Sequence, residues 1–252
     1  MAGIASPRSS AGWKAAFSCR HTIALACIAV LAGCAPVIAR LPDGEARWEY
    51  DLGQQRIPLV YPPGASPVLS DYGSATSITG QTRYQSHNGI DLGALGDPVL
   101  AMADGYVYFA DHRVSGNSIE IQHGRNEDGW VSVTTYGHLQ EIRVAKGQFV
   151  RRGDLIGIVG NTGQDGYAGP VAHVHVNVLF HTGEPNTGWI SRNPHRYWLD
   201  GPGRITCFDP ARSYPPTPYD KERAQDNPPR FGFYRSGRDR QPILFTYPIP
   251  CK

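Results

Sequence analysis

Short β-prone runs separated by glycine, aspartate and asparagine constrain the fold of this chain more than any other feature of its sequence. Between about residues 61 and 182, runs such as Trp130–Leu139 and Gly153–Gly163 alternate apolar with polar residues, or are short and apolar between glycine turns. No stretch sustains the 3.6-residue period of an amphipathic helix. The 29 glycines and 21 prolines also fit many turns and short strands better than a helical bundle. We therefore predict a mainly β, antiparallel fold.

One segment of this region carries a hairpin signal. In Pro98–Asp111, two β-rich runs flank Asp104-Gly105, a residue pair typical of two-residue hairpin turns. The sequence therefore predicts that the runs on either side of this pair are joined by a tight turn.

The stretch "AHVHVNV" alternates polar residues with valines. Side chains in a strand point to opposite faces in turn, so His173, His175 and Asn177 should share one face, and the three valines the other. The valine face is expected to lie in the core. The histidine face is a candidate site if other parts of the chain bring suitable groups to it.

Length, charge and proline content bound the organisation. A chain of 252 residues, 40% of them hydrophobic, suits one domain with extensions or two small ones. The formal charge of only +2 gives no support for nucleic-acid binding, and we expect no nucleic-acid partner. Residues 201–252 contain ten of the 21 prolines, which excludes most regular structure. We expect residues 186–252 to form an irregular, proline- and aromatic-rich C-terminal extension.

The N-terminal 33 residues are typical of a secretory signal. Basic residues precede the apolar run Thr22–Gly33, which is shorter than the about 20 residues that a membrane-spanning helix needs. The run ends in "LAGC", which resembles a bacterial lipobox, and this resemblance implies a lipid on Cys34. The alternative is an ordinary signal peptide cleaved nearby, for example after Ala39. Since Ala35 rather than aspartate follows the cysteine, the lipobox resemblance implies an anchor on the periplasmic face of the outer membrane.

If the chain is a lipoprotein cleaved before Cys34, only two other cysteines remain in the mature protein. Cys207 and Cys251 are the two left in an oxidising compartment, and we predict a disulfide between them. Closing this loop would contribute about 3–4 kcal/mol if the geometry is unstrained. Two unpaired thiols are the alternative. Residues 34–60, which show no clear periodicity, are expected to be a tether.

Histidine and aspartate side chains suggest a metal site. In "SHNGIDLG", His87 and Asp91 are four residues apart, and both imidazole nitrogen and carboxylate oxygen are good zinc ligands. A third ligand from His173 or His175 would leave the fourth position open, which is the arrangement of a catalytic rather than a structural zinc site. His138, in "TYGHL", ends another strand-like run. Each of these motifs alone is weak evidence, and the combination is much more specific.

Taken together in this order, the motifs resemble those of the LytM/lysostaphin-type zinc metallopeptidases, which cut peptide bonds in bacterial peptidoglycan. The resemblance extends from about Tyr84 to Phe180, less than half of the chain. It rests on "HNGIDLGALGDPVLAMADGYVYFA", "YGHLQEIRVAKGQFVRRGDLIGIVGNTG" and "HVHVNV". It implies that residues 61–185 form a LytM/lysostaphin-like antiparallel β domain, the duplicated hybrid motif.

The resemblance also assigns roles to individual residues. It implies that His87, Asp91 and His175 bind Zn²⁺, and that His138 and His173 are catalytic histidines beside the water and the scissile carbonyl. The family often has an acidic residue two positions after this last zinc ligand, where the present chain has Asn177. That difference leaves the implied ligands and catalytic residues intact and is expected to affect the tuning of the site.

The implied function is a monomeric zinc-dependent endopeptidase that hydrolyses the peptide cross-links of peptidoglycan, its substrate being the stem peptides. One alternative is a catalytically silent wall-binding or amidase-activating lipoprotein of the same fold. Such relatives lack some of the five polar positions, whereas this chain retains all five. A structural lipoprotein that tethers the envelope to the wall is a third possibility.

Other polar residues receive structural interpretations. Tyr136 is expected to pack in its strand, and Arg152 to lie in a solvated turn with its neighbours. No chemical role is predicted for His112, His123 or His195, nor is one for the histidine at position 181.

Overall fold

The computed structural model describes residues 49–50, 57–126, 130–163, 169–181, 188–217 and 243–252. The predicted signal of residues 1–33, the predicted lipidation site Cys34 and most of the predicted tether lie outside these ranges. Within the described part, no helix is both long and apolar enough to cross a membrane.

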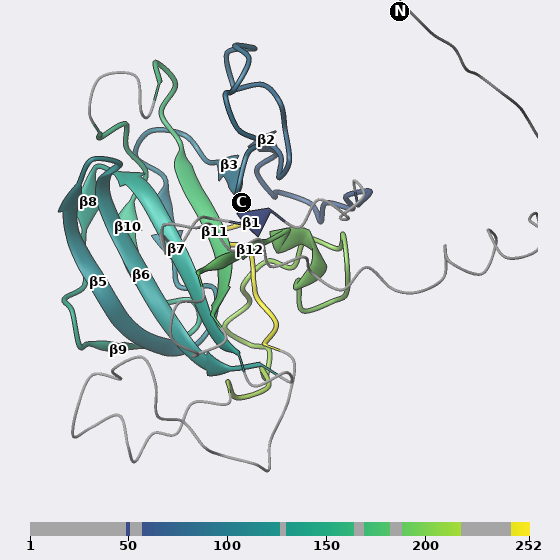
Figure 1. Ribbon diagram of the computed structural model, residues 1–252. Helices are drawn as coiled ribbons and strands as arrows, with labels where there is room; N and C mark the ends of the chain where they lie inside the picture. The colour runs from purple at the N-terminus through teal and green to yellow at the C-terminus, as the bar shows by residue number, and fades with distance from the viewer. Residues whose placement is uncertain (1–48, 51–56, 127–129, 164–168, 182–187, 218–242) are drawn as a thin grey trace, which may run out of the picture. The chain divides into compact units, whose positions relative to one another are not determined.

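Strands dominate the described residues (Figure 1). They are β1 (Glu49–Tyr50), β2 (Val68–Ser70), β3 (Ile90–Leu92), β4 (Pro98–Leu100), β5 (Gly105–Arg113), β6 (Gly116–Arg125), β7 (Val131–Leu139), β8 (Glu141–Ile142), β9 (Phe149–Val150), β10 (Leu155–Ile158), β11 (Val174–His181) and β12 (Ile190–Arg192). A single turn of 3₁₀ helix, η1 (Pro194–Arg196), follows β12.

The main sheet runs in the order β1-β12-β11-β7-β6-β5-β9, with β3 paired to β11 and β2 paired to β3. Strands β5, β6, β7 and β11 lie side by side and form its long part, as Figure 1 shows. Each of the pairs among them is antiparallel. The predicted mainly β, antiparallel fold is confirmed.

The predicted hairpin at Asp104-Gly105 is wrong. Strand β4, before this pair, belongs to a separate small sheet with the order β4-β10-β8. Strand β5, after it, pairs with β6 and β9 instead. The reason is that Asp104 bonds to distant groups: its carbonyl oxygen lies 2.8 Å from a ring nitrogen of His123, and its carboxylate accepts the Arg152 backbone N–H at 2.8 Å. These long-range bonds hold the chain at the junction between two sheets.

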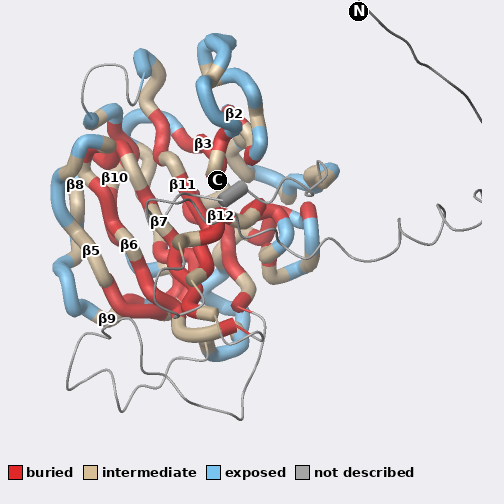
Figure 2. The backbone as a smooth tube through the Cα atoms, in the orientation of Figure 1, coloured by how far each residue is buried: buried red, intermediate tan, exposed pale blue. Residues whose placement is uncertain are grey.

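The two faces of β11 are divided as the alternation predicted. Val174, Val176 and Val178 are each 0% exposed and belong to one core cluster. Figure 2 shows buried residues along the middle of β6, β7 and β11. Burying one such side chain contributes about 1.5–3 kcal/mol. The core therefore fixes the register of β11 and, with it, the positions of the histidines on the opposite face.

The region after residue 186 is partly regular. Strand β12 pairs antiparallel with β11, so the main sheet continues past residue 185. Among the described residues beyond η1, Trp198, Phe245 and Tyr247 are fully buried in the core cluster of the β domain. Cys207 and Cys251 are paired in a disulfide, with their Cα atoms 5.9 Å apart. This segment therefore packs tightly on the sheet.

Arg152 corrects another expectation, because it is buried rather than solvated. Only 7% of this residue is exposed. Its guanidinium donates to the carbonyl oxygens of Met102 and Leu244, at 2.6 and 2.8 Å, and lies over the ring of Tyr214. A buried charge needs such partners. Arg152 thus bonds the C-terminal segment to the β domain.

Candidate metal centre and catalytic groove

The antiparallel register brings the predicted site residues together on three adjacent strands. On β11, His175 stands opposite Asp91 of β3 on one side and opposite Gly137 of β7 on the other. His138 follows directly after Gly137. His87 precedes β3 by a few residues, so strand pairing alone places these residues within one small region of the sheet.

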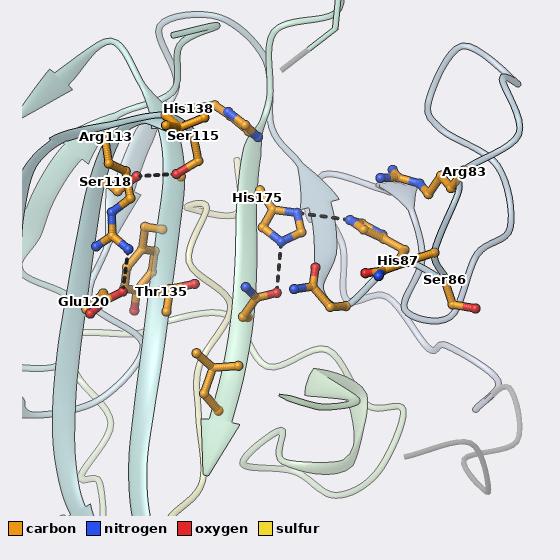
Figure 3. A pocket seen from close by; sticks show the side chains of 17 residues that line it. Arg83, Ser86, His87, Arg113, Ser115, Ser118, Glu120, Thr135, His138 and His175 are labelled. Atoms are coloured by element: carbon orange, nitrogen blue, oxygen red, sulfur yellow. Dashed lines mark hydrogen bonds and ion pairs between the residues drawn. The ribbon is translucent and has the colours of Figure 1, made fainter. Parts of the chain in front are cut away.

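Three of these residues direct one atom each toward a common point. His87 Nε2 lies 3.1 Å from Asp91 Oδ1 and 3.0 Å from His175 Nδ1, and His175 Nδ1 lies 2.8 Å from Asp91 Oδ1. His87 and Asp91 are 2% exposed. Figure 3 shows the imidazoles of His87 and His175 facing each other.

Neighbouring acceptors decide which ring nitrogens are available at this point. His87 Nδ1 lies 2.9 Å from the carbonyl oxygen of Asp71, which can only accept, so Nδ1 must carry a proton and donate it. His175 Nε2 lies 2.9 Å from Asn177 Oδ1 and donates to it in the same way. In the neutral imidazoles, the opposite nitrogens therefore present their lone pairs to Asp91.

This donor set fits a divalent cation. Two lone pairs and a carboxylate oxygen at about 3 Å from one another are stabilised only by a proton or a cation among them. Two imidazole nitrogens and one carboxylate oxygen are typical ligands of catalytic zinc, which keeps a further position open. His87, Asp91 and His175 are also the group of described residues with metal-ligand spacing.

The two remaining predicted histidines lie beside this centre. His173 Nδ1 donates to the carbonyl oxygen of Val171 at 2.7 Å, and His138 Nδ1 donates to that of Thr162 at 3.1 Å. Their ring centroids are 4.8 Å apart. In both residues Nε2 is therefore the nitrogen with the lone pair, and Nε2 of His173 lies 3.6 Å from Asp91 Oδ1. The structure thus brings all five predicted residues together.

Burial sets the charge state of these groups. Burial, together with the neighbouring imidazoles of His175 and His173, lowers the pKa of His138 to about 4. Burial also lowers the pKa of His173. Burial alone would raise the pKa of Asp91, but the adjacent imidazoles of His175 and His87 outweigh it and hold this pKa well below the ordinary range. At neutral pH the centre therefore has an ionised carboxylate beside neutral imidazoles able to accept a proton.

Two backbone features are needed to build the site. A Cβ at Gly89 would overlap Asn177 Oδ1 and the carbonyl oxygen of Val176, so the glycine of the His-x-Gly-x-Asp motif allows close approach to β11. His138 has a φ of 63°, and among the described residues it is the only non-glycine with a positive φ. Such a conformation costs about 1–3 kcal/mol and is typical of functional sites. It turns the backbone where β7 passes the centre.

Arg83 is a further site residue that sequence reasoning missed. Its Nη2 donates to Asp91 Oδ2 at 3.0 Å and to Ser70 Oγ at 3.2 Å, and its Nε donates to the Thr76 carbonyl oxygen at 3.2 Å. It therefore holds the carboxylate oxygen that does not face the imidazoles. A basic residue four positions before His87 was the available signal, and it is too common to identify such a role.

The centre lies where two cavities meet. One has a volume of about 560 Å³ and the other about 220 Å³, and both are lined by Arg83, His138 and His175. The larger extends over β7 toward Arg113 and Glu120, which form an ion pair at 2.9 Å and lie on β5 and β6 (Figure 3). We refer to these two cavities, which share lining residues at the centre, as the groove.

The fold and this site define a mainly antiparallel β domain with a His/Asp/His group that could hold a metal ion beside two cavities. Residues 85–186 match Peptidase family M23. The matched residues include the five site residues identified above.

Curated relatives match over similar lengths. The peptidoglycan DD-endopeptidase ShyA of Vibrio cholerae is 40% identical over 99 residues, which cover 38% of this chain and 21% of the relative. The DD-carboxypeptidase/endopeptidase Mpg of Neisseria meningitidis is 35% identical over 123 residues, covering 48% and 26%. The chain therefore spans about a fifth to a quarter of the length of these relatives.

Solved structures of related peptidases also match. The catalytic domain of lysostaphin from Staphylococcus simulans is 24% identical, with a TM-score of 0.37, and the match covers 51% of this chain and 86% of that one. A variant of the catalytic domain of the prophage-encoded M23 protein EnpA from Enterococcus faecalis is 26% identical. Its TM-score is 0.40, with coverage of 55% and 94%.

Proposed function

We propose that this protein is a zinc-dependent endopeptidase that hydrolyses peptide cross-links in bacterial peptidoglycan. The observation that carries the proposal is the convergence of His87 Nε2, Asp91 Oδ1 and His175 Nδ1 within about 3 Å of one another, beside two neutral imidazoles. The match of residues 85–186 to a peptidase family supports it. The similarity to ShyA, a peptidoglycan DD-endopeptidase, supports peptidoglycan as the substrate class.

The chemistry divides between the metal and the protein. Bound zinc supplies Lewis acidity, which lowers the pKa of water to about 7 and polarises a carbonyl group. His87, Asp91 and His175 would hold the ion. The neutral imidazoles of His138 and His173 accept the proton of the attacking water at Nε2, and in the protonated form stabilise the oxyanion or protonate the leaving amine. Their carbonyl partners keep Nδ1 protonated throughout.

The groove suits an extended peptide. Because His138 and His175 line both cavities, a peptide bound in them would lie beside the proposed metal ligands and the proposed catalytic imidazoles. We propose that the stem peptides of peptidoglycan bind in this way.

The location of the protein belongs to the same proposal. We propose that the chain is a monomer held by a lipid on Cys34 at the periplasmic face of the outer membrane. Intact-mass analysis of the mature protein would reveal the lipid, and Cys34→Ala would release the protein into the soluble fraction. Cleavage after Ala39 without a lipid would contradict the anchor and leave the enzymatic proposal standing.

The test of the function is digestion of purified, cross-linked peptidoglycan by residues 35–252 loaded with zinc. We expect cross-linked muropeptide dimers to disappear, as read by mass spectrometry, and expect both a chelator and His175→Ala to prevent this. Zinc-loaded protein that leaves the dimers intact would exclude hydrolysis of this bond. Protein that binds no zinc would favour the silent, wall-binding alternative.

A further inference from the structure

The loop that carries His87 is hydrogen-bonded to residues 190–198. These residues lie beyond the segment matched by the peptidase family. Two hydroxyl groups make part of this support. Tyr72 Oη donates to the carbonyl oxygen of Ser191 at 3.1 Å, and Ser191 Oγ donates to the carbonyl oxygen of Asn88, the residue next to His87. The support therefore reaches both ends of the loop.

A third connection leads to the ring of His87 itself. Trp198 Nε1 donates to His195 Nδ1 at 3.1 Å, so the proton of His195 resides on Nε2. His195 Nε2 donates to Asp71 Oδ1 at 2.9 Å. The backbone carbonyl of the same Asp71 accepts the Nδ1–H of His87 at 2.9 Å. The residue that orients the His87 ring is thus itself held by His195.

The same segment is also fixed to the strand of the other imidazole ligand. Strand β12 pairs with β11, and Ser191 stands opposite Leu179, four residues beyond His175. Ser191, His195 and Trp198 are 0% exposed, whereas the side chain of Asp71 is 29% exposed. The segment is therefore bonded to both elements that bring His87 and His175 to within 3.0 Å of each other.

We propose that Ser191 and His195 are positioning residues that hold His87 in its ligand geometry and thereby set the affinity of the metal centre. This inference rests on the proposed metal site. Partners of metal-ligating histidines commonly affect metal affinity by 10–100-fold. His195 acts one residue further away, through Asp71, and we expect an effect of about tenfold, at the lower end of that range.

The test compares His195→Phe with His195→Gln, in which the side-chain amide can still donate to Asp71. His123→Phe is the matched control. His123 is also 0% exposed, with both ring nitrogens bonded, but its partners are Asp104 and Thr134 rather than the His87 loop. Zinc affinity is measured by competition with a chromogenic chelator, the cobalt-substituted absorption spectrum reports ligand geometry, and thermal unfolding of the metal-free protein reports stability.

We expect His195→Phe to weaken zinc binding about tenfold and to change the cobalt spectrum. We expect His195→Gln to recover most of the affinity, and His123→Phe to lose stability with unchanged zinc affinity. Wild-type affinity in folded His195→Phe would overturn the inference, as would equal losses of affinity in His195→Phe and His123→Phe. Absence of zinc binding by the wild type would instead overturn the proposed metal site itself.

Milder variants keep the inference testable if His195→Phe does not fold. Tyr72→Phe and Ser191→Ala each remove one hydroxyl bond to the support. We expect each to weaken zinc binding by about 2–5-fold with a similar cobalt spectrum, since only one of three connections is lost. Unchanged affinity in both, with both proteins folded, would contradict the positioning role.

Discussion

Two sets of buried imidazoles in this protein have similar surroundings but differ in whether they line a cavity. At the candidate centre, His138 and His173 each donate one N–H to a backbone carbonyl, and both residues line the smaller cavity beside Asp91. In the core, His123 also has a ring nitrogen beside a backbone carbonyl, that of Asp104, but its other nitrogen bonds to Thr134 at 2.7 Å. His138 and His173 are therefore candidates for catalysis, whereas both ring nitrogens of His123 form bonds within the core.

The pKa values do not separate the two sets. Burial lowers the pKa of His123 to about 4, and it lowers that of His138 to about 4 as well. A depressed pKa therefore shows only that an imidazole is buried. What distinguishes the candidate catalytic residues is that they line a cavity, whereas His123 is enclosed in the core.

The largest effect is expected when a metal ligand is removed. His175→Ala deletes the Nδ1 donor from the centre, so both the metal and the activity should be lost, with the rate falling more than about 10⁴-fold. His123→Gln is the matched change in the core and should leave metal content unchanged. Metal analysis and muropeptide digestion measure both. Full zinc content in His175→Ala would show that the ligand set is wrong.

A smaller effect is expected for His138 and His173, the two imidazoles proposed to transfer protons. His173→Ala and His138→Ala should each lower the rate about 10²–10⁴-fold while the protein retains zinc, since they transfer protons rather than hold the metal. The informative measurement is the rate per bound zinc. If either variant loses its zinc along with its activity, that residue acts as a ligand and the division of roles proposed above fails.

Much of the site was readable from sequence because its parts are local. The two-residue alternation around His175 places His173, His175 and Asn177 on one face. The spacing of His87 and Asp91, four residues apart, indicates a pair of ligands at the start of β3. Because the valines of β11 must face the core, the register of this strand is fixed, and with it the positions of its histidines. Each motif spans only a few residues, whereas the choice of His175 over His173 as a ligand and the roles of His138 and His173 came from the family resemblance.

What sequence did not reveal depends on distant contacts. Asp104-Gly105 has a hairpin composition but joins two sheets, because its carboxylate and carbonyl bond to Arg152 and His123. Arg152 reads as a surface residue until Leu244 is known to cover it. The sequence around His195 predicts no role for it, because its partner Asp71 is distant in the chain. Local pattern does not contain such pairings.

At low pH, protonation of His123 should affect the stability of the protein rather than its activity. Unfolded histidine has a pKa of about 6.5, so below that pH the unfolded chain binds a proton that folded His123 refuses until about pH 4. The unfolded state then binds more protons, and the free energy of unfolding falls as the pH falls through this window. From about pH 7.5 to about pH 5, the contribution of His123 should fall by roughly 2 kcal/mol.

Urea unfolding of the wild type and His123→Gln at both pH values measures this difference. The variant carries no titrating group at this position, so its stability should decline less over the same range. Equal declines in the two proteins would mean that burial of His123 is not what opposes protonation. Other groups titrate in both proteins and cancel in the comparison.

The smallest effect is expected for Asn177. Its Oδ1 accepts a hydrogen bond from Nε2 of His175, a proposed metal ligand. Asn177→Asp would let a carboxylate accept the His175 Nε2–H, making Nδ1 a stronger donor to the metal. We expect zinc affinity to rise by up to about tenfold, and kcat to fall, because a metal that receives more charge polarises water less. Asn177→Leu removes the acceptor and should weaken zinc binding instead. Opposite shifts of affinity in the two variants, measured with the same chelator, would show that the amide tunes the centre, whereas equal losses would indicate that Asn177 matters only for its packing against Gly89.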